Sequence, residues 1–288
     1  MKYLITFAQL VALSAYPLLG QQNPYFVTYD HRMEEHQNLE LSIQSTIGIQ
    51  KQNLPGSLGQ LFELEYGMTP WWSSALYLEG AFQKHDSTVF TGFRIENRFK
   101  ALNGEHSINP VLYFEYENIS EASRIRKEIL GHAEPSNESL QDLSRETARE
   151  IEAKLILSSD IRSWNVADNF IVEKNLTKDE GFEFGYALGV FHPLSTKPLG
   201  THCRLCLQDL SVGMELYGGL GSTEQFGFKD TAHYVAPILV WNIAQSQAIK
   251  VSPGFGLTPN SDRMILRFGY TYEINGFGKK ISRMLGAR

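Results

Sequence analysis

The sharpest local feature of the sequence is a short run with two thiols and an imidazole, His202-Cys203-Arg204-Leu205-Cys206. Zinc and copper both accept thiolate and imidazole ligands, and the C-x-x-C spacing also occurs in redox motifs. A structural zinc site usually needs four ligands, and no obvious fourth ligand lies near this run. The chemistry open to the run is therefore a disulfide, a pair of reduced thiols, a metal site or a catalytic redox pair.

A second cluster of metal-ligand types is Asp30-His31-Arg32-Met33-Glu34-Glu35-His36. Two histidines and three carboxylates within seven residues could collect a borderline metal such as copper or zinc. The run lies just before the first expected strand, where a polar stretch is ordinarily in contact with water. We interpret it as a solvated periplasmic segment, with the metal site as the alternative, and we expect neither a bound metal nor a cofactor.

Common catalytic motifs are missing from the sequence. It has no G-x-S-x-G, no H-E-x-x-H and no P-loop, and Gly218-Gly219-Leu220-Gly221 is not followed by Lys-Ser/Thr. A lipid-acting barrel enzyme needs a nucleophile and a base together, whereas His233 near Thr231 is isolated in the sequence. We expect that the protein is not an enzyme, and a lipid-acting membrane enzyme is an alternative.

The N-terminus reads as a targeting segment. Residues 1–20 combine one lysine, an apolar stretch and small residues near a cleavage position, which is typical of a secretory signal. An exported protein with two cysteines favours a disulfide, here between Cys203 and Cys206. The rest of the chain has no apolar run of the roughly 18–20 residues that a membrane helix needs. A composition of 20% charged and 12% aromatic residues with net charge −6 argues against a disordered chain and a nucleic-acid-binding protein.

Most of the remaining chain alternates apolar and polar residues with a period of two, which indicates half-buried strands. For example, Leu112-Phe114-Tyr116 alternates with Tyr113-Glu115-Glu117. Many of the expected strands exceed the five or six residues usual in soluble sheets and fit the about 9–11 residues of a tilted membrane strand. The twelve expected strands are 38–50, 58–69, 73–84, 87–100, 108–120, 149–160, 164–176, 181–193, 208–219, 232–244, 247–258 and 262–275.

Alternation alone does not tell which face of these strands points inward. A soluble barrel turns its apolar face inward, whereas a membrane barrel turns its polar face to the lumen and its apolar face to lipid. Strand length, the secretory signal and aromatic residues near strand ends, such as Trp71, Trp72 and Trp164, favour the membrane. A soluble periplasmic protein that binds a ligand is the alternative. The sequence therefore predicts an all-β fold, a twelve-stranded antiparallel up-and-down transmembrane β-barrel.

The expected organisation follows from this barrel. A signal peptide at 1–20 precedes a periplasmic N-terminal segment at 21–37, and the barrel at 38–276 is followed by a basic C-terminal tail at 277–288. An even number of strands places both termini on the same side, the periplasm, where connections are short. The long surface loop 121–148 contains the one helical passage, which we interpret as a solvated flap, with a lid over the pore as the alternative.

The polar face of the strands predicts an acidic lumen. Carboxylates on this face outnumber Arg and Lys, so pairing across strands cannot neutralise all of them, and a narrow acidic lumen favours cations. We therefore predict a passive channel or transporter for small solutes that prefers cations, and a structural or partner-binding barrel with a filled lumen is the alternative. The candidate lumen-lining residues are Glu63, Glu65, Glu79, Arg94, Glu96, Arg98, Glu115, Glu117, Glu150, Glu152, Lys154 and Arg267.

Six stretches of the chain carry a resemblance to known sequences. They are NPYFVTYDHRMEE (23–35), DSTVFTGFRIENRFK (86–100), NPVLYFEYENI (109–119), EIEAKLILSSDIRSWNVADNFIVEKNL (150–176), VGMELYGGLG (212–221) and ILRFGYTYEI (265–274). Together they resemble a family of uncharacterised outer-membrane β-barrel envelope proteins, over nearly the whole mature chain. A vaguer likeness, at the level of the fold, is to outer-membrane transporters of the MetA-pathway type.

The resemblance implies a monomeric barrel in the outer membrane of a Gram-negative-type cell, with outer-membrane lipid as its partner and no nucleic acid. It supplies no catalytic or binding residues. One departure concerns the C-terminus, because many outer-membrane barrels end on an aromatic residue that the assembly machinery reads. This chain instead continues past Phe277 with GKKISRMLGAR.

Overall fold

The computed structural model describes residues 23–49, 57–83, 88–124, 142, 144–194, 210–228, 230–244 and 246–286. Each of the twelve expected ranges overlaps one observed strand, so the predicted strand number is confirmed. Cys203, Cys206, the signal 1–20 and most of the loop 121–148 lie outside the described residues. The strands are β1 Leu39–Ile49, β2 Ser57–Thr69, β3 Trp72–Gln83, β4 Thr88–Lys100, β5 Asn109–Ser120, β6 Thr147–Ile161, β7 Trp164–Asn175, β8 Phe182–Pro193, β9 Leu210–Ser222, β10 His233–Ala244, β11 Gln247–Gly256 and β12 Met264–Ile274.

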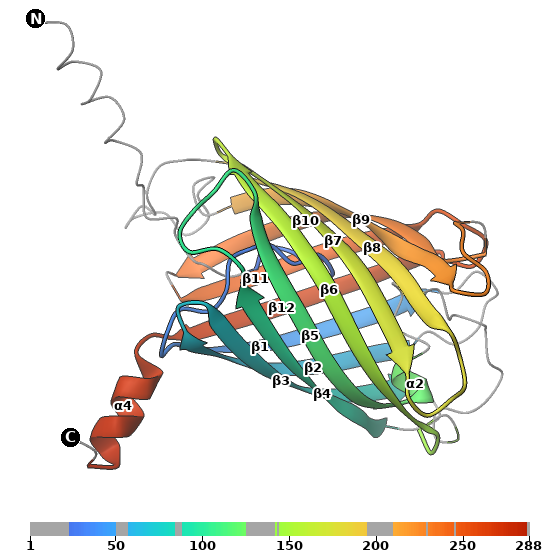
Figure 1. Ribbon diagram of the computed structural model, residues 1–288, viewed down its shortest axis with the longest axis horizontal. Helices are drawn as coiled ribbons and strands as arrows, with labels where there is room; N and C mark the ends of the chain where they lie inside the picture. The colour runs from blue at the N-terminus through green and yellow to red at the C-terminus, as the bar shows by residue number, and fades with distance from the viewer. Residues whose placement is uncertain are drawn as a thin grey trace, which may run out of the picture.

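The strands form one closed barrel in which every strand is antiparallel to both of its neighbours (Figure 1). β1 pairs with β12 from Leu39 opposite Ile274 to Ile49 opposite Met264, and this pairing removes the exposed edges of the sheet. The predicted antiparallel up-and-down barrel is therefore confirmed. We call the end at which β1 begins and β12 ends the terminus end, and the opposite end the far end.

Two helices are described beside the barrel, and neither belongs to its wall. α2, Glu121–Arg124, follows β5 at the far end, and α4, Phe277–Met284, projects from the terminus end after β12 (Figure 1). Within the described part of the chain, no helix has the length and apolar character needed to cross a membrane. The wall consists of strands alone.

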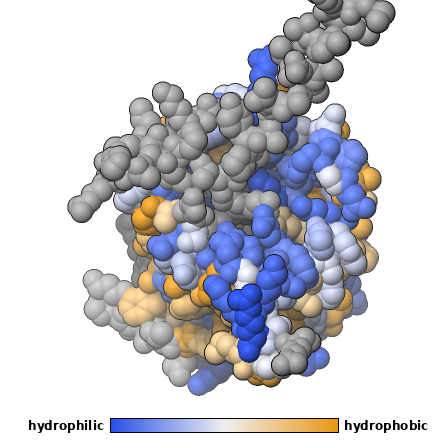
Figure 2. Space-filling view, turned by 90° about the vertical axis from the view of Figure 1, so that its left-hand side faces the viewer, coloured by the Kyte–Doolittle hydropathy of each residue, from blue (hydrophilic) through white to orange (hydrophobic). Residues whose placement is uncertain are grey.

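The two faces of each strand differ as a membrane barrel requires. On β5, Leu112 and Phe114 are exposed, whereas Tyr113 and Glu115 between them are buried. Apolar side chains therefore cover the outside, where lipid contacts a membrane barrel, and polar side chains face the interior. Viewed from the terminus end, hydrophilic surface gathers toward the centre and hydrophobic patches lie around the edge (Figure 2).

Arginine substitutions on the two faces of the wall test this sidedness. Phe114 of β5 is 48% exposed on the outer face, whereas Gln44 of β1 lines the polar interior. If Phe114 lies near the bilayer midplane, Phe114→Arg is expected to cost about 2–4 kcal/mol of folding free energy in lipid vesicles, because lipid cannot solvate a guanidinium. Gln44→Arg serves as the inner-face comparison in urea unfolding, and a smaller cost at Phe114 than at Gln44 would contradict the assignment.

The interior of the barrel contains the segment that precedes β1. Residues 23–38, here called the inner segment, run inside the wall (Figure 1). Val27 packs with Ile171 and Tyr217, and Met33 packs with Tyr113, all of them buried. The interpretation of residues 30–36 as a solvated run is therefore wrong for its first part, because Asp30, His31 and Met33 are buried, whereas Glu35 and His36 are exposed. Side chains of the wall form hydrogen bonds and ion pairs with the polar groups of the buried part.

Candidate functional site

The tightest attachment of the inner segment is to one carboxylate on β9. Glu215 accepts the backbone N–H groups of Val27 at 2.8 Å and Thr28 at 2.7 Å through Oε1, and that of Phe26 at 3.3 Å through Oε2. Glu215 is fully buried, so the three N–H groups replace the water that its charge would otherwise need. One wall residue thus fixes the backbone direction of three consecutive residues.

Two asparagines of β7 hold the neighbouring part of the inner segment. Asn169 accepts the Tyr29 N–H at 2.7 Å through Oδ1 and donates to the Tyr29 carbonyl at 2.8 Å through Nδ2. The Asn169 amide therefore makes one accepted and one donated hydrogen bond to the Tyr29 backbone, as a neighbouring strand would. Tyr25 adds a side-chain contact, because its hydroxyl donates to Asn165 Oδ1 at 2.8 Å.

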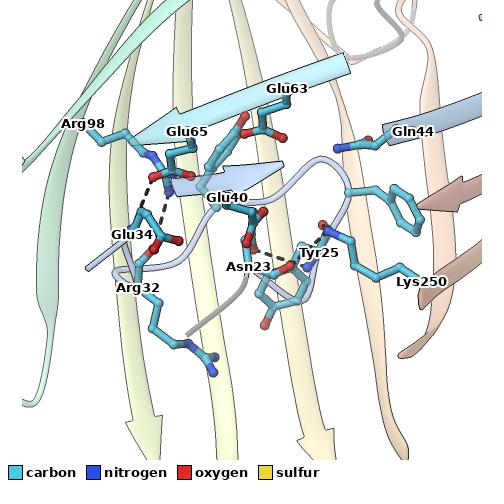
Figure 3. Close-up of a pocket in the computed structure, with 12 residues that line it drawn as sticks. Asn23, Tyr25, Arg32, Glu34, Glu40, Gln44, Glu63, Glu65, Arg98 and Lys250 are labelled. Atoms are coloured by element: carbon cyan, nitrogen blue, oxygen red, sulfur yellow. Dashed lines mark hydrogen bonds and ion pairs between the residues drawn. The ribbon is translucent and has the colours of Figure 1, made fainter. Parts of the chain in front are cut away.

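Cationic side chains of the wall donate hydrogen bonds to backbone carbonyls of the inner segment. Lys250 on β11 donates from Nζ to the carbonyls of Asn23 and Tyr25, at 3.0 Å each (Figure 3). Arg98 on β4 donates to the carbonyl of Arg32 at 3.4 Å. The segment is therefore held by carboxylate, amide and cationic groups from strands distributed around the wall.

Arg98 is also the centre of a buried ionic group on the wall. Its guanidinium forms ion pairs with Glu65 of β2 and, at 2.7 Å, with Glu96 of its own strand. The same guanidinium lies over the ring of Tyr29, 5.3 Å from its centroid. Tyr29 in turn donates from its hydroxyl to Glu96 at 3.2 Å. The inner segment and the wall thus share one network of charges.

Further ion pairs lie on β3 to β6. Arg94 is 2.5 Å from Glu79 and 3.2 Å from Glu115. Lys154 is 2.9 Å from Glu152. The Arg94 pairs cross strands, as the filled-lumen alternative expects, whereas Lys154 and Glu152 lie on the same strand, β6. Part of the acidic wall of the described residues is therefore paired.

The structure places all twelve sequence-predicted lumen residues on the inward side of the strands. Glu63, Glu79 and Arg94 are half-buried. The other nine are buried, namely Glu65, Glu96, Arg98, Glu115, Glu117, Glu150, Glu152, Lys154 and Arg267. The ion pairs bring Arg98 together with Glu65 and Glu96.

Sequence reasoning missed the residues that grip the inner segment. The sequence pattern does not single out Asn165, Asn169, Glu215 or Lys250. Lys250 lies on a strand whose alternation is irregular, which hid its inward parity. The asparagines carry no charge, so a search for chemistry in the sequence passes over them.

The barrel interior contains one cavity toward the far end and another against the inner segment. The larger, of about 130 Å³, lies toward the far end and is lined by residues that include Gln44, Glu79, Arg94 and Arg267. The smaller, of about 30 Å³, lies against the inner segment (Figure 3). Residues of the inner segment line the smaller cavity and are not among those that line the larger one.

Glu34 of the inner segment is the clearest perturbed group outside the strands. Burial, together with the nearby carboxylates of Glu40, Glu273 and Glu65, raises the pKa of Glu34 to about 9. Its backbone N–H donates to Glu65 Oε1 at 3.3 Å. At neutral pH the Glu34 carboxyl is therefore protonated, which removes one negative charge from this group of carboxylates.

Comparisons with known proteins agree with this geometry. No family model and no curated protein matches the chain. Among solved structures, the KdgM porin matches with a TM-score of 0.50 at 11% identity, over 80% of this chain and 98% of that chain. An outer-membrane channel from Pseudomonas putida F1 matches with a TM-score of 0.57 at 9% identity, over 85% and 98%. At these identities the likeness concerns the fold, and the chain has the barrel fold of outer-membrane porins.

Proposed function

We propose that the protein is an outer-membrane channel for small solutes that is closed by its own inner segment. The observation that carries this proposal is the grip of buried Glu215 on three consecutive backbone N–H groups of residues 26–28. These contacts hold residues 26–28 inside the lumen of a barrel with a porin fold. Opening then requires that the inner segment leave the wall.

Release of the inner segment is compatible with a stable wall. Every strand of the barrel pairs with two other strands, and none pairs with the inner segment over more than an isolated bridge between His36 and Gly67. The segment is attached mainly by side chains, whose hydrogen bonds water can replace. The barrel can therefore stay closed as a sheet while the lumen opens.

The even strand number brings both ends of the barrel sheet to the terminus end. We place this end in the periplasm, with outer-membrane lipid around the apolar outer face and the protein as a monomer. The inner segment then enters the lumen from the periplasm. The far end, with the larger cavity, faces the outside of the cell.

The carboxylate rows of the wall support a preference for cations. Glu96, Glu115, Glu152 and Glu173 lie directly opposite one another on β4, β5, β6 and β7. A second row, closer to the far end, places Glu117 of β5 opposite Glu150 of β6. Carboxylates along a pore raise the local cation concentration and repel anions.

Ion selectivity in planar bilayers tests the proposal. In a KCl gradient, the open channel is expected to show a cation-selective reversal potential that weakens as salt rises, because screening shortens the range of the wall charges. Glu117→Gln with Glu150→Gln should reduce the selectivity, and Thr46→Ala, an inward polar change without loss of charge, is the control. Anion selectivity would contradict the cation preference.

The paired charges of the lumen favour a second candidate, a structural or partner-binding barrel that never opens. Arg94, Arg98 and Lys154 each contact at least one inward carboxylate. Failure of the chain to conduct, even in variants that weaken the inner segment, would support this candidate over the channel.

A further inference from the structure

His31 of the inner segment meets two carboxylates of the barrel at the terminus end. Its Nε2 lies 3.0 Å from Glu105 Oε2, in the connection between β4 and β5, and 3.8 Å from Asp160 Oδ2 near the end of β6. One ligand atom from each of the three residues lies within 4.8 Å of the other two. We propose that His31, Glu105 and Asp160 form a binding site for one Zn²⁺ ion.

The distances fit the coordination sphere of zinc. Zn²⁺ binds imidazole nitrogen and carboxylate oxygen at about 2.0–2.2 Å, so tetrahedral ligands lie about 3.3 Å from one another. The two distances from His31 Nε2, 3.0 Å and 3.8 Å, lie on either side of this value. Glu105 has a side chain that is 71% exposed, so it can adjust toward an ion and leave a fourth position for water.

A second observation concerns the far side of the imidazole. His31 Nδ1 lies 2.5 Å from Ser158 Oγ, and this oxygen also accepts the His31 backbone N–H at 2.8 Å. An outer partner of this kind fixes the ring of a metal-binding histidine and directs its other nitrogen at the ion. The side chain of His31 is 4% exposed, so the ring has little room to turn away.

Asp160 is held in the same manner. Its Oδ1 accepts a hydrogen bond from Asn165 Nδ2 at 2.7 Å, which leaves Oδ2 directed toward His31. Arg32 is a cation that interacts with Asp160, and it also donates to Asp30 at 2.7 Å, where its charge is compensated. His31 and Asp160 are therefore both oriented before an ion binds.

The contact between Nε2 and Glu105 Oε2 needs a hydrogen atom or a cation between the two atoms. Two lone pairs at 3.0 Å repel each other, so either a proton on the imidazole or a cation lies between them. A mixed nitrogen and oxygen ligand set of three residues suits zinc, whereas Ca²⁺ and Mg²⁺ prefer six or more oxygen ligands.

The bound ion would connect three parts of the molecule, namely the inner segment, the connection between β4 and β5, and β6. It would therefore stabilise the segment in the lumen and oppose opening. This consequence rests on the proposed channel function, whereas zinc binding itself does not.

Calorimetric titration tests the site directly. The full chain, purified in detergent and freed of metal with a chelator, is titrated with ZnCl₂. We expect one equivalent to bind, and Glu105→Gln with Asp160→Asn to abolish that binding. Glu224→Gln, an exposed carboxylate on the connection after β9, should leave it unchanged, and Ser158→Ala should weaken it by about tenfold or more.

The cysteines require a separate control, because they could bind zinc themselves. The same titration in a Cys203→Ser, Cys206→Ser chain should still show the one equivalent. Loss of zinc binding in this chain, or unchanged binding after Glu105→Gln with Asp160→Asn, would overturn the site. Conductance is measured in parallel: zinc that binds but does not lower conductance leaves the site standing and rejects its link to opening.

Discussion

Glu215→Ala is expected to raise the conductance of the protein in planar bilayers by about tenfold or more. The substitution removes the acceptor of three backbone N–H groups, those of Phe26, Val27 and Thr28. Hydrogen bonds to a charged group contribute about 1.5–3 kcal/mol each, and the loss of a single such bond corresponds to about a tenfold shift in an equilibrium. The N–H groups would also be left without a partner in a dry site, so the inner segment should move into water.

Two further variants make this result specific. Glu215→Gln keeps one oxygen that can accept from Val27 and Thr28, but near the Phe26 N–H it places an amide NH₂, which cannot accept a hydrogen bond. This variant should therefore open the lumen less than Glu215→Ala. Thr46→Ala alters an inward residue of β1 that lies opposite Arg267 and lines the cavity toward the far end. If Thr46→Ala conducts as well as Glu215→Ala does, loss of the contacts with residues 26–28 is not the cause and the proposed closure is rejected.

The barrel could be predicted from the sequence because its signal repeats along each strand. β5 and β6 alternate without interruption, and their inward glutamates can be assigned from parity alone. A membrane barrel also leaves its apolar face exposed, so the pattern is not blurred by the packing of a second layer. Local alternation therefore determined both the strand number and the face of residues such as Glu115 and Glu152.

The inner segment could not be predicted in this way. Residues 30–36 have no period and look like a solvated run, because charge usually means exposure. Their burial depends on partners far away in the sequence, such as Ser158 for His31 and Asn169 for Tyr29. Contacts of this kind leave no local pattern, and the wall residues that make them look like ordinary lumen lining.

Arg98→Met is expected to destabilise the barrel by about 3–5 kcal/mol in urea unfolding from lipid vesicles. Arg98 forms ion pairs with Glu65 and Glu96, and all three residues are buried. Removal of one partner of a buried ion pair leaves an uncompensated charge in a poorly solvated site, which costs more than the pair contributes. Arg98→Lys keeps the charge but loses the planar fork that contacts both carboxylates, so it should cost less than Arg98→Met.

The combined variant separates loss of charge balance from loss of packing. Arg98→Met with Glu65→Gln and Glu96→Gln removes the cation and both carboxylates, so no charge of this group is left alone. Because a buried ionic group can often be replaced as a whole at little cost, the combined variant should recover most of the stability that Arg98→Met loses. If it unfolds as readily as the single variant, the guanidinium acts through its packing on Tyr29, 5.3 Å from the ring centroid, and its ion pairs are not what stabilises the wall.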